Sequence, residues 1–218
     1  MTAEADSLPN VTPQTDRHSR RREQTRSKLM QAARALFARQ GIEDTRINEI
    51  TEEADVGFGS FYNHFESKEA IVEAVIGETL AAQGAAVDAL TAKLEDPAQV
   101  VAAAHRYFVN LARTDPEWGW LLIRLDRSQS VSLAALGPFA ERDIERGIKA
   151  GRFHVSNKRV ALFGCGGALL AVMRDVLDGH APKDADRHHA EGVLRWLGLP
   201  PEEAAEVARR PMPRMPAR

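Results

Sequence analysis

Apolar side chains recur at the spacing of an α-helix in one segment after another, and this pattern constrains the fold more than any other feature of the chain. Between residues 20 and 40, for example, Leu29, Leu36 and Phe37 fall on one helical face before Gly41 ends the segment. Nowhere among the 218 residues do apolar and polar side chains alternate as they do in a half-buried strand. The sequence therefore predicts an all-α fold.

Changes in composition and pattern divide the chain into four parts. Residues 1–19 are polar and contain two prolines, so we expect a disordered arm with a basic end. Residues 20–66 hold three short helical segments, and residues 67–210 hold a long helix to about residue 93 followed by further helices. Residues 211–218 are interrupted by prolines and are predicted to be a disordered tail.

The charge of the chain is unevenly distributed. Residues 17–28 carry six arginine and lysine residues and one glutamate, a net charge of +5, whereas the whole chain has a net charge of −2. The remainder therefore sums to −7, since −2 minus +5 is −7. A basic block on an acidic body favours a polyanionic partner, most commonly nucleic acid. The alternative is a solubilising arm without a specific partner.

The composition indicates a soluble protein of a reducing compartment. Cys165 is the single cysteine, so no disulfide can form within the chain. The longest apolar run, residues 161–173, is too short to span a bilayer. The first residues lack the apolar core of a secretory signal. We therefore expect the protein in the cytoplasm, associated with the nucleoid if its partner is DNA.

Residues 45–65 predict two short helices joined by a tight turn. Helices below about a dozen residues depend on tertiary packing, and apolar side chains such as Ile50 and Phe61 provide a common buried face. Thr45 is the expected N-cap of the first helix. Asp55 is expected in a left-handed backbone conformation, which aspartate tolerates better than most residues. This arrangement is that of a helix-turn-helix, whose second helix lies in the major groove of DNA.

The second of these helices carries the side chains expected to contact DNA. Two glycines remove side chains where the backbone approaches phosphates or base edges, and hydroxyl, imidazole and amide groups can hydrogen-bond to them. An exposed phenylalanine can contact a thymine methyl group. Lys68 begins the next helix, where it can reach a further phosphate. The predicted contacts of this segment are Gly57, Phe58, Gly59, Ser60, Tyr62, Asn63, His64 and Lys68.

This part of the chain resembles the DNA-binding domain of the TetR family of transcriptional regulators. The resemblance rests on ADVGFGSFYNHFESKE at residues 54–69, preceded by AARALFARQG at residues 32–41 and TRINEI at residues 45–50. It covers about a quarter of the chain. The sequence departs from the family's pattern at Asp55, where glycine is usual, and at Phe58, where a polar or basic residue is common. The resemblance therefore does not imply a base preference at Phe58.

The resemblance implies roles for the residues in and around these helices. Positions 57–60 and 63 would meet bases. The residues that would hold the DNA backbone are Tyr62, His64, Lys68, Thr45 and Arg46. Independently of the resemblance, the position of the basic block just before the first helix predicts that it reaches phosphates or an adjacent minor groove, as N-terminal arms do in other helix-turn-helix proteins. The residues are Arg20, Arg21 and Arg22, and a solubilising arm remains the alternative.

The same resemblance implies that the remaining helices form a regulatory domain that binds a small molecule and dimerises. Small residues on adjoining turns between residues 157 and 178 permit close helix–helix approach, and residues 184–197 carry an apolar stripe. Together they would suit a four-helix interface across a two-fold axis, although tight packing within one subunit is the alternative. The residues assigned to the interface are Gly164, Gly167, Ala168, Ala171, Val193, Leu194 and Leu197. Such a dimer places two recognition helices about 34–36 Å apart and predicts a palindromic operator.

Candidates for effector binding lie mainly on the predicted helices between about residues 100 and 140. Ligand pockets are mostly apolar with a few polar groups, and the side chains here have that composition. The same residues at helical spacing also fit a plain hydrophobic core, which is the alternative. The candidates are His105, Phe108, Trp118, Leu121, Leu122, Arg124, Phe139 and Met173.

The sequence thus predicts a sequence-specific DNA-binding transcriptional regulator, a homodimeric repressor released from a palindromic operator by a small-molecule effector. The alternatives are a ligand-independent regulator, an activator and a non-specific architectural DNA-binding protein. We do not expect an enzyme, since no nucleophile and base are grouped in a plausible site. We expect neither a cofactor nor a metal, because His180, His188 and His189 have no cysteine or carboxylate beside them at metal-ligand spacing.

Overall fold

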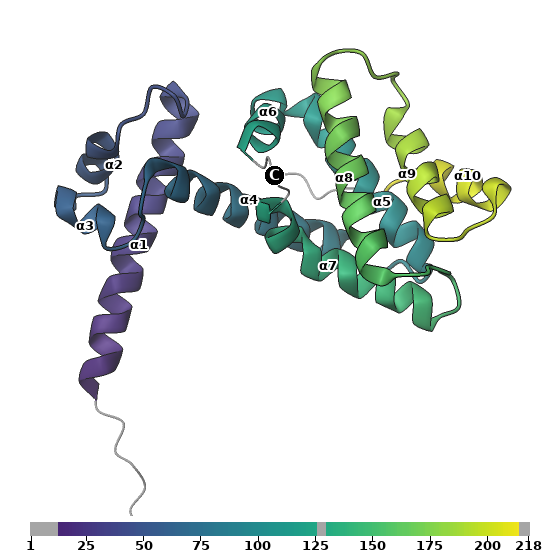
Figure 1. Ribbon diagram of the computed structural model, residues 1–218, viewed down its shortest axis with the longest axis horizontal. Coiled ribbons are helices and arrows are strands. Elements are labelled where there is room, and N and C mark those ends of the chain that lie inside the picture. Colours follow the sequence, from purple (N-terminus) through teal and green to yellow (C-terminus); the bar gives the residue numbers. More distant parts are fainter. Residues whose placement is uncertain (1–12, 126–129, 214–218) are drawn as a thin grey trace, which may run out of the picture. The chain divides into compact units, whose positions relative to one another are not determined.

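The computed structural model describes residues 13–125 and 130–213, and within them the chain is built from helices (Figure 1). It forms two compact units, Met1–Val75 and Ile76–Arg218. The described residues contain no strand, so the predicted all-α fold is confirmed. The helices are α1 Pro13–Gln40, α2 Ile47–Glu53, α3 Phe58–Tyr62, α4 Lys68–Thr91, α5 Pro97–Thr114, α6 Pro116–Leu125, α7 Ser130–Lys149, α8 Lys158–Leu177, α9 Ala185–Trp196 and α10 Pro201–Arg209.

The first unit is formed by α1, α2, α3 and the start of α4. One side chain from each of the first three helices, Leu29, Ile50 and Phe61, is fully buried in a shared core. Short helices such as α2 and α3 are stable only in packing of this kind. Ile71 and Val75 of α4 belong to the same core. The unit therefore ends inside α4 at Val75 and not at residue 66.

The first helix is longer than the sequence pattern indicates. α1 begins at Pro13, so residues 13–19 are helical and do not belong to a disordered arm. Proline is favoured at the first helical position, where its fixed φ suits the helix and its missing N–H costs no hydrogen bond. The rest of the predicted arm, residues 1–12, lies outside the described residues, as does the end of the predicted tail, residues 214–218.

The turn between α2 and α3 has the predicted left-handed residue, but the start of α2 differs from the prediction. Asp55 has a φ of 52°, which confirms its expected conformation. The N-cap of α2 is Arg46 and not Thr45. The backbone N–H of Arg46 donates to Glu49 Oε2 at 2.7 Å. A carboxylate at the third helical position can accept the backbone N–H of the N-cap residue. This hydrogen bond makes Arg46, one position after Thr45, the N-cap of α2.

α5 is the central helix of the second unit, where it packs against α7, α8, α9 and α10 (Figure 1). Its start is fixed by Asp96, whose carboxylate accepts the Ala98 N–H at 3.0 Å, and by Pro97 at the first helical position. The core beside it includes Phe153 and Leu194, both almost completely buried. This helix therefore holds the second unit together.

α10 is absent from the sequence prediction. Its start nevertheless carries the usual signals, because Pro201 is at the first position and Glu202 and Glu203 lie in the first turn. Ala204 and Val207 bury this short helix against the core. The predicted regulatory domain thus contains one helix more than its apolar pattern indicates.

The apolar stripe of α9 faces the core of its own unit, which corrects the predicted subunit interface. Val193, Leu194 and Leu197 are 3%, 0% and 0% exposed. Trp196 is 50% exposed, and its ring covers Gly164 of α8, where an added Cβ would lie 2.1 Å from it. Gly164 therefore serves contact between α8 and α9 within one subunit, the alternative that the sequence left open.

Candidate functional site

α3 presents aromatic and glycine residues on the surface of the first unit. Phe58 and Tyr62 are 53% and 52% exposed, and their rings meet edge-on with centroids 5.7 Å apart. Gly59 faces open space, since a Cβ added there would have no atom within 4 Å. Phe61 is fully buried and anchors the helix. An exposed aromatic pair beside an open glycine is typical of a contact surface.

The other predicted contacts of α3 surround this pair. His64 lies with Arg22 and Arg26 around a small surface hollow. Burial, followed by the charges of Arg22 and Arg26, lowers the pKa of His64. Its imidazole is therefore neutral at pH 7, with one donor and one acceptor nitrogen. Of the remaining predicted residues, Gly57 and Asn63 are exposed and Ser60 is half-buried.

The basic block of α1 lies beside the C-terminal end of α3. Arg22 Nη2 donates to the carbonyl oxygen of Asn63 at 3.4 Å. Arg20 and Arg21 are exposed on the same segment of α1. These arginines are thus carried by a helix of the first unit, next to the surface that α3 presents.

Two predicted backbone-contacting side chains are engaged within the unit. Thr45 is 1% exposed, and its hydroxyl donates to the Gly41 carbonyl oxygen at 2.6 Å. This side chain is not available to a phosphate, which corrects the prediction for Thr45. Lys68 Nζ donates to the Glu43 carbonyl oxygen at 3.1 Å. An ammonium has three donors, so Lys68 can hold this loop and still face a phosphate, as can the exposed Arg46.

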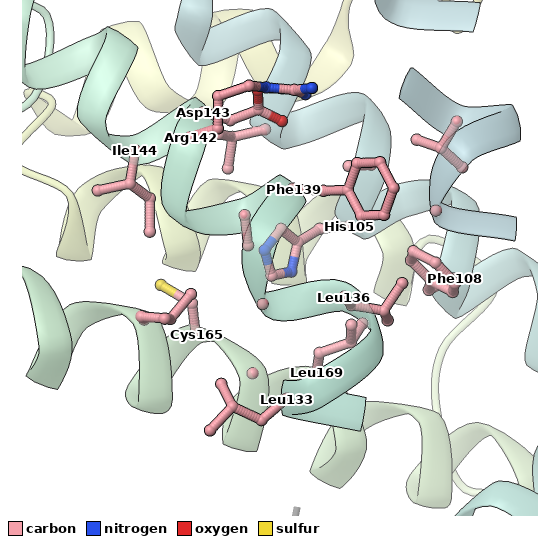
Figure 2. Close-up of a pocket in the computed structure, with 18 of the residues that line it drawn as sticks. His105, Phe108, Leu133, Leu136, Phe139, Arg142, Asp143, Ile144, Cys165 and Leu169 are labelled. Atoms are coloured by element: carbon pink, nitrogen blue, oxygen red, sulfur yellow. The ribbon is translucent and has the colours of Figure 1, made fainter. Parts of the chain in front are cut away.

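The second unit contains a cavity of about 120 Å³ that is lined by residues of α4, α5, α6, α7 and α8 and by Leu197 at the end of α9 (Figure 2). Trp118, a predicted ligand contact, is not among the lining residues, although it lies only four residues, about 6 Å, before Leu122 on α6. The side chains of Leu121 and Arg124 lie outside the described part of the structure. The predicted residues that do line the cavity are His105, Phe108, Leu122, Phe139 and Met173.

One end of the cavity carries a group of charges that the sequence analysis missed (Figure 2). Arg142 of α7 contacts Asp88 of α4 at 2.5 Å and the adjacent Asp143 at 2.8 Å. Burial raises the pKa of Asp143, and hydrogen bonds to the two carboxylates raise the pKa of Arg142. Asp88, Asp143 and Arg142 together carry a net charge of −1, and the positive charge of Arg146 also acts on Asp143. Asp88 and Arg142 are 54 positions apart, so no local sequence pattern could pair them.

His105, a polar residue of the cavity wall, is paired with a second histidine. Its Nδ1 lies 2.9 Å from Nε2 of His189 on α9, with the two rings tilted by 51°. Burial, with the neighbouring His189 as a further cause, lowers the pKa of His105 to about 3. Burial also lowers the pKa of His189 to about 4. Both imidazoles are therefore neutral at pH 7, and one donates to the other.

α8 is more apolar than its packing within the chain requires. An 18-residue apolar stretch of this helix has only 22% of its residues buried. Val160 is 61% exposed, Ala171 is exposed, and Gly167 and Ala168 are half-buried. α4 and α8 are each long and apolar enough to cross a membrane by length and composition, a test that core helices of soluble proteins also pass. α8 therefore exposes an apolar face within the described residues.

Family models match both units of the chain. Residues 29–75 match the model for bacterial regulatory proteins of the tetR family, and residues 96–210 match the model for a tetracyclin repressor-like C-terminal domain. The second match alone spans more than half of the 218 residues. The chain belongs to the TetR family of transcriptional regulators. Its first unit is therefore the helix-turn-helix DNA-binding domain of a TetR-family regulator, and its second unit is the C-terminal domain.

TetR-family proteins resemble this chain over different lengths. The repressor KstR2 of Mycolicibacterium smegmatis is 40% identical over 55 residues, or 25% of this chain and 27% of that protein, so the match spans about a quarter of the relative's length. The crystal structure of RolR in complex with resorcinol has a TM-score of 0.80 and 35% identity, covering 91% of this chain and 100% of that chain. Thermus thermophilus FadR in complex with lauroyl-CoA has a TM-score of 0.62 and 21% identity, covering 79% and 92%, and shows the shared fold alone.

Proposed function

We propose that this TetR-family regulator is a homodimeric repressor that binds a palindromic operator through α3 and leaves it when a small hydroxylated aromatic compound occupies the cavity. The cavity is the observation that carries the proposal, because it combines an apolar wall, a charged end and a histidine in a space of about 120 Å³. A regulator of this family acts on DNA in the cytoplasm, which agrees with the single buried cysteine, Cys165.

The volume of the cavity limits the effector to about one ring. A cavity of about 150 Å³ holds benzene, and pockets for drug-sized ligands are about 300–1,000 Å³. The cavity of this chain, at about 120 Å³, belongs to the first class. An acyl-CoA of the kind present in the FadR complex is far larger. Resorcinol, present in the RolR complex, is a single ring with two hydroxyl groups.

The charges at the end of the cavity favour hydrogen-bond donors over anions. The guanidinium of Arg142 is already paired with Asp88 and Asp143, so it leaves no unbalanced positive charge for a carboxylate. Carboxylate oxygens accept hydrogen bonds from hydroxyl groups. The site therefore suits a neutral phenol rather than a benzoate.

Isothermal titration calorimetry tests the effector class directly. We expect resorcinol to bind the wild-type protein and benzoate, a ring of similar size with a negative charge, to bind far more weakly. In the Asp143→Asn variant the net charge of −1 is removed, so the difference between the two compounds should shrink. Benzoate binding as tightly as resorcinol to the wild type would refute the proposed effector class.

The surface of α3 supports operator binding. Tyr62 and Phe58 project into solvent beside Gly59, and the arginines of α1 lie next to them. Fluorescence anisotropy with the DNA upstream of the gene measures this interaction, with scrambled DNA as competitor. Tyr62→Ala should weaken specific binding, whereas Tyr62→Phe, which keeps the ring, separates the hydroxyl from the aromatic contact. Equal affinity for scrambled DNA would favour an architectural DNA-binding protein instead.

The exposed face of α8 supports a homodimer. Val160 and Ala171 lie on this face, and Trp196 of α9 adds a large exposed apolar side chain. Sedimentation of the wild-type protein should give a dimer at micromolar concentration. Val160→Glu should shift the equilibrium to monomer, and Ala92→Glu, at an exposed alanine outside α8 and α9, is the matched control. A monomeric wild type would refute the homodimer and the palindromic operator with it.

α4 offers a route from the cavity to the DNA-binding domain. The same helix contributes Val75 to the core of the first unit and Asp88 to the cavity wall. A ligand shifts an equilibrium only by its differential affinity for two conformations. Resorcinol added to the protein–operator complex should therefore lower the anisotropy. An unchanged signal with bound resorcinol would favour a ligand-independent regulator, and tighter DNA binding would reverse the direction of regulation.

A further inference from the structure

His105 has one ring nitrogen paired with His189 and the other left for the cavity. Nδ1 faces Nε2 of His189 at 2.9 Å. His105 lines the cavity (Figure 2), whereas His189 is not one of the lining residues. Nε2 of His105 makes no hydrogen bond with any residue in 13–125 or 130–213. In the described part of the chain, Nε2 of His105 is not a buried atom left without a partner. It faces accessible space in the cavity, where water or a polar group of a bound molecule can pair with it.

The contact between the two rings couples their tautomers. Each ring is neutral, so each carries a single N–H. If Nδ1 of His105 carries the hydrogen, it donates to His189, and Nε2 of His105 accepts hydrogen bonds from the cavity. If Nε2 of His189 carries it, Nδ1 of His105 accepts, and Nε2 of His105 becomes a donor to the cavity. The two rings therefore carry their hydrogens both on Nδ1 or both on Nε2.

We infer that His105 binds the effector through Nε2, and that His189 sets across the shared hydrogen bond whether this nitrogen accepts or donates. His189 is then a positioning residue. A phenolic hydroxyl group that donates its hydrogen to Nε2 of His105 selects the form with both hydrogens on Nδ1. To reach it from the other form, the shared hydrogen crosses from His189 to His105, the Nε2 hydrogen of His105 leaves to water, and Nδ1 of His189 takes one up. Each ring is neutral before and after this exchange, and the pair keeps two hydrogens in all.

This inference rests on the proposed effector site, and NMR tests it separately from that site. Long-range ¹H–¹⁵N spectra of protein labelled with ¹⁵N-histidine report the tautomer of each ring, and the variants His105→Gln and His189→Gln assign the two signals. Resorcinol, with binding established first by calorimetry, should place both rings in the Nδ1–H form. A His105 signal that does not move at saturation, or two rings with different tautomers, would overturn the inference and leave the effector class standing.

Calorimetry of variants separates the positioning role of His189 from a structural one. His189→Leu removes the partner of His105 Nδ1 and should weaken resorcinol binding about tenfold. His189→Gln, whose amide can donate or accept, should restore most of the affinity. The matched control is His188→Gln, at a neighbour whose side chain is 65% exposed, and it should leave the affinity unchanged.

The other possible results of these experiments also decide whether His105 binds the effector and whether His189 positions it. Equal resorcinol affinities of the His189→Leu and His189→Gln variants would overturn the role of His189. If circular dichroism shows that the His189→Leu variant does not fold, the NMR titration of the wild type decides alone. A wild-type protein that does not bind resorcinol would overturn both this inference and the effector class, while operator binding, measured by anisotropy, would stand.

Discussion

Lowering the pH from 7 to 5 should reduce the free energy of unfolding through His105 and His189. Burial lowers the pKa of His105 to about 3 and that of His189 to about 4 in the folded chain. In the unfolded chain a histidine titrates near pH 6.5. Between these values the unfolded chain binds more protons than the folded chain, so stability falls as the pH falls. Above pH 6.5 both states are largely neutral at these rings, and the effect vanishes.

The size of the effect follows from the distance to the unfolded pKa. At pH 5, about 1.5 pH units below it, protonation of one unfolded histidine stabilises the unfolded state by about 2 kcal/mol. The pair therefore accounts for a loss of up to about 4 kcal/mol. Domains have unfolding free energies of about 5–15 kcal/mol, so the loss is a large fraction of the total.

Urea unfolding followed by circular dichroism at pH 7, 6 and 5 measures this loss, at one fixed protein concentration because dimerisation contributes to stability. The double variant His105→Gln/His189→Gln should lose much less stability between pH 7 and pH 5 than the wild type. His188→Gln, at a side chain that is 65% exposed, should behave as the wild type does. If the wild type and the double variant lose the same free energy, the buried pair is not the origin of the acid sensitivity.

Three further perturbations have defined outcomes. Gly147→Ala would place a Cβ 2.0 Å from the Phe153 ring, so thermal unfolding should show a loss of about 1–3 kcal/mol, whereas Gly166→Ala, with no atom within 4 Å, should not lose stability. Phe61→Ala empties the core of the first unit and should cost about 3–5 kcal/mol, measured by urea unfolding; a loss below 1 kcal/mol would contradict its anchoring role. Alanine at residues 20–22 should make the slope of operator affinity against salt concentration shallower by up to about 0.9 for each phosphate that these arginines neutralise, and an unchanged slope would assign them to solubility alone.

The sequence by itself determined the local structure and the DNA-binding domain. The apolar spacing that placed Leu29, Ile50 and Phe61 on inward faces is a property of the 3.6-residue helical turn, and all three are fully buried. The left-handed conformation of Asp55 was predictable because few residue types tolerate it within a tight turn. The TetR family was likewise predictable, because the residues on which the resemblance rests lie close together in the sequence, between residues 32 and 69.

The candidate site was predictable only in part. The aromatic and histidine residues of α5 were recognised because they stand out within one helix, and His105 and Phe108 do line the cavity. The Thr45 cap was wrong because it depended on competition between neighbouring residues for one N–H, which Glu49 decided in favour of Arg46. The sequence indicated which functional groups each segment carries, but it did not indicate which of these groups would contact one another in the folded chain.

Tertiary structure alone decided the partners of the regulatory domain. The stripe of Val193 and Leu194 predicted a buried face, but only the packing of α9 on α5 shows that its own subunit buries it. The charge group of Asp88 and Arg142 is formed by side chains 54 positions apart, which meet because α4 and α7 both border the cavity. Helical periodicity predicts that one face of a helix is buried. It does not predict which surface covers that face, because the hydrophobic effect is non-directional and any apolar surface can bury it.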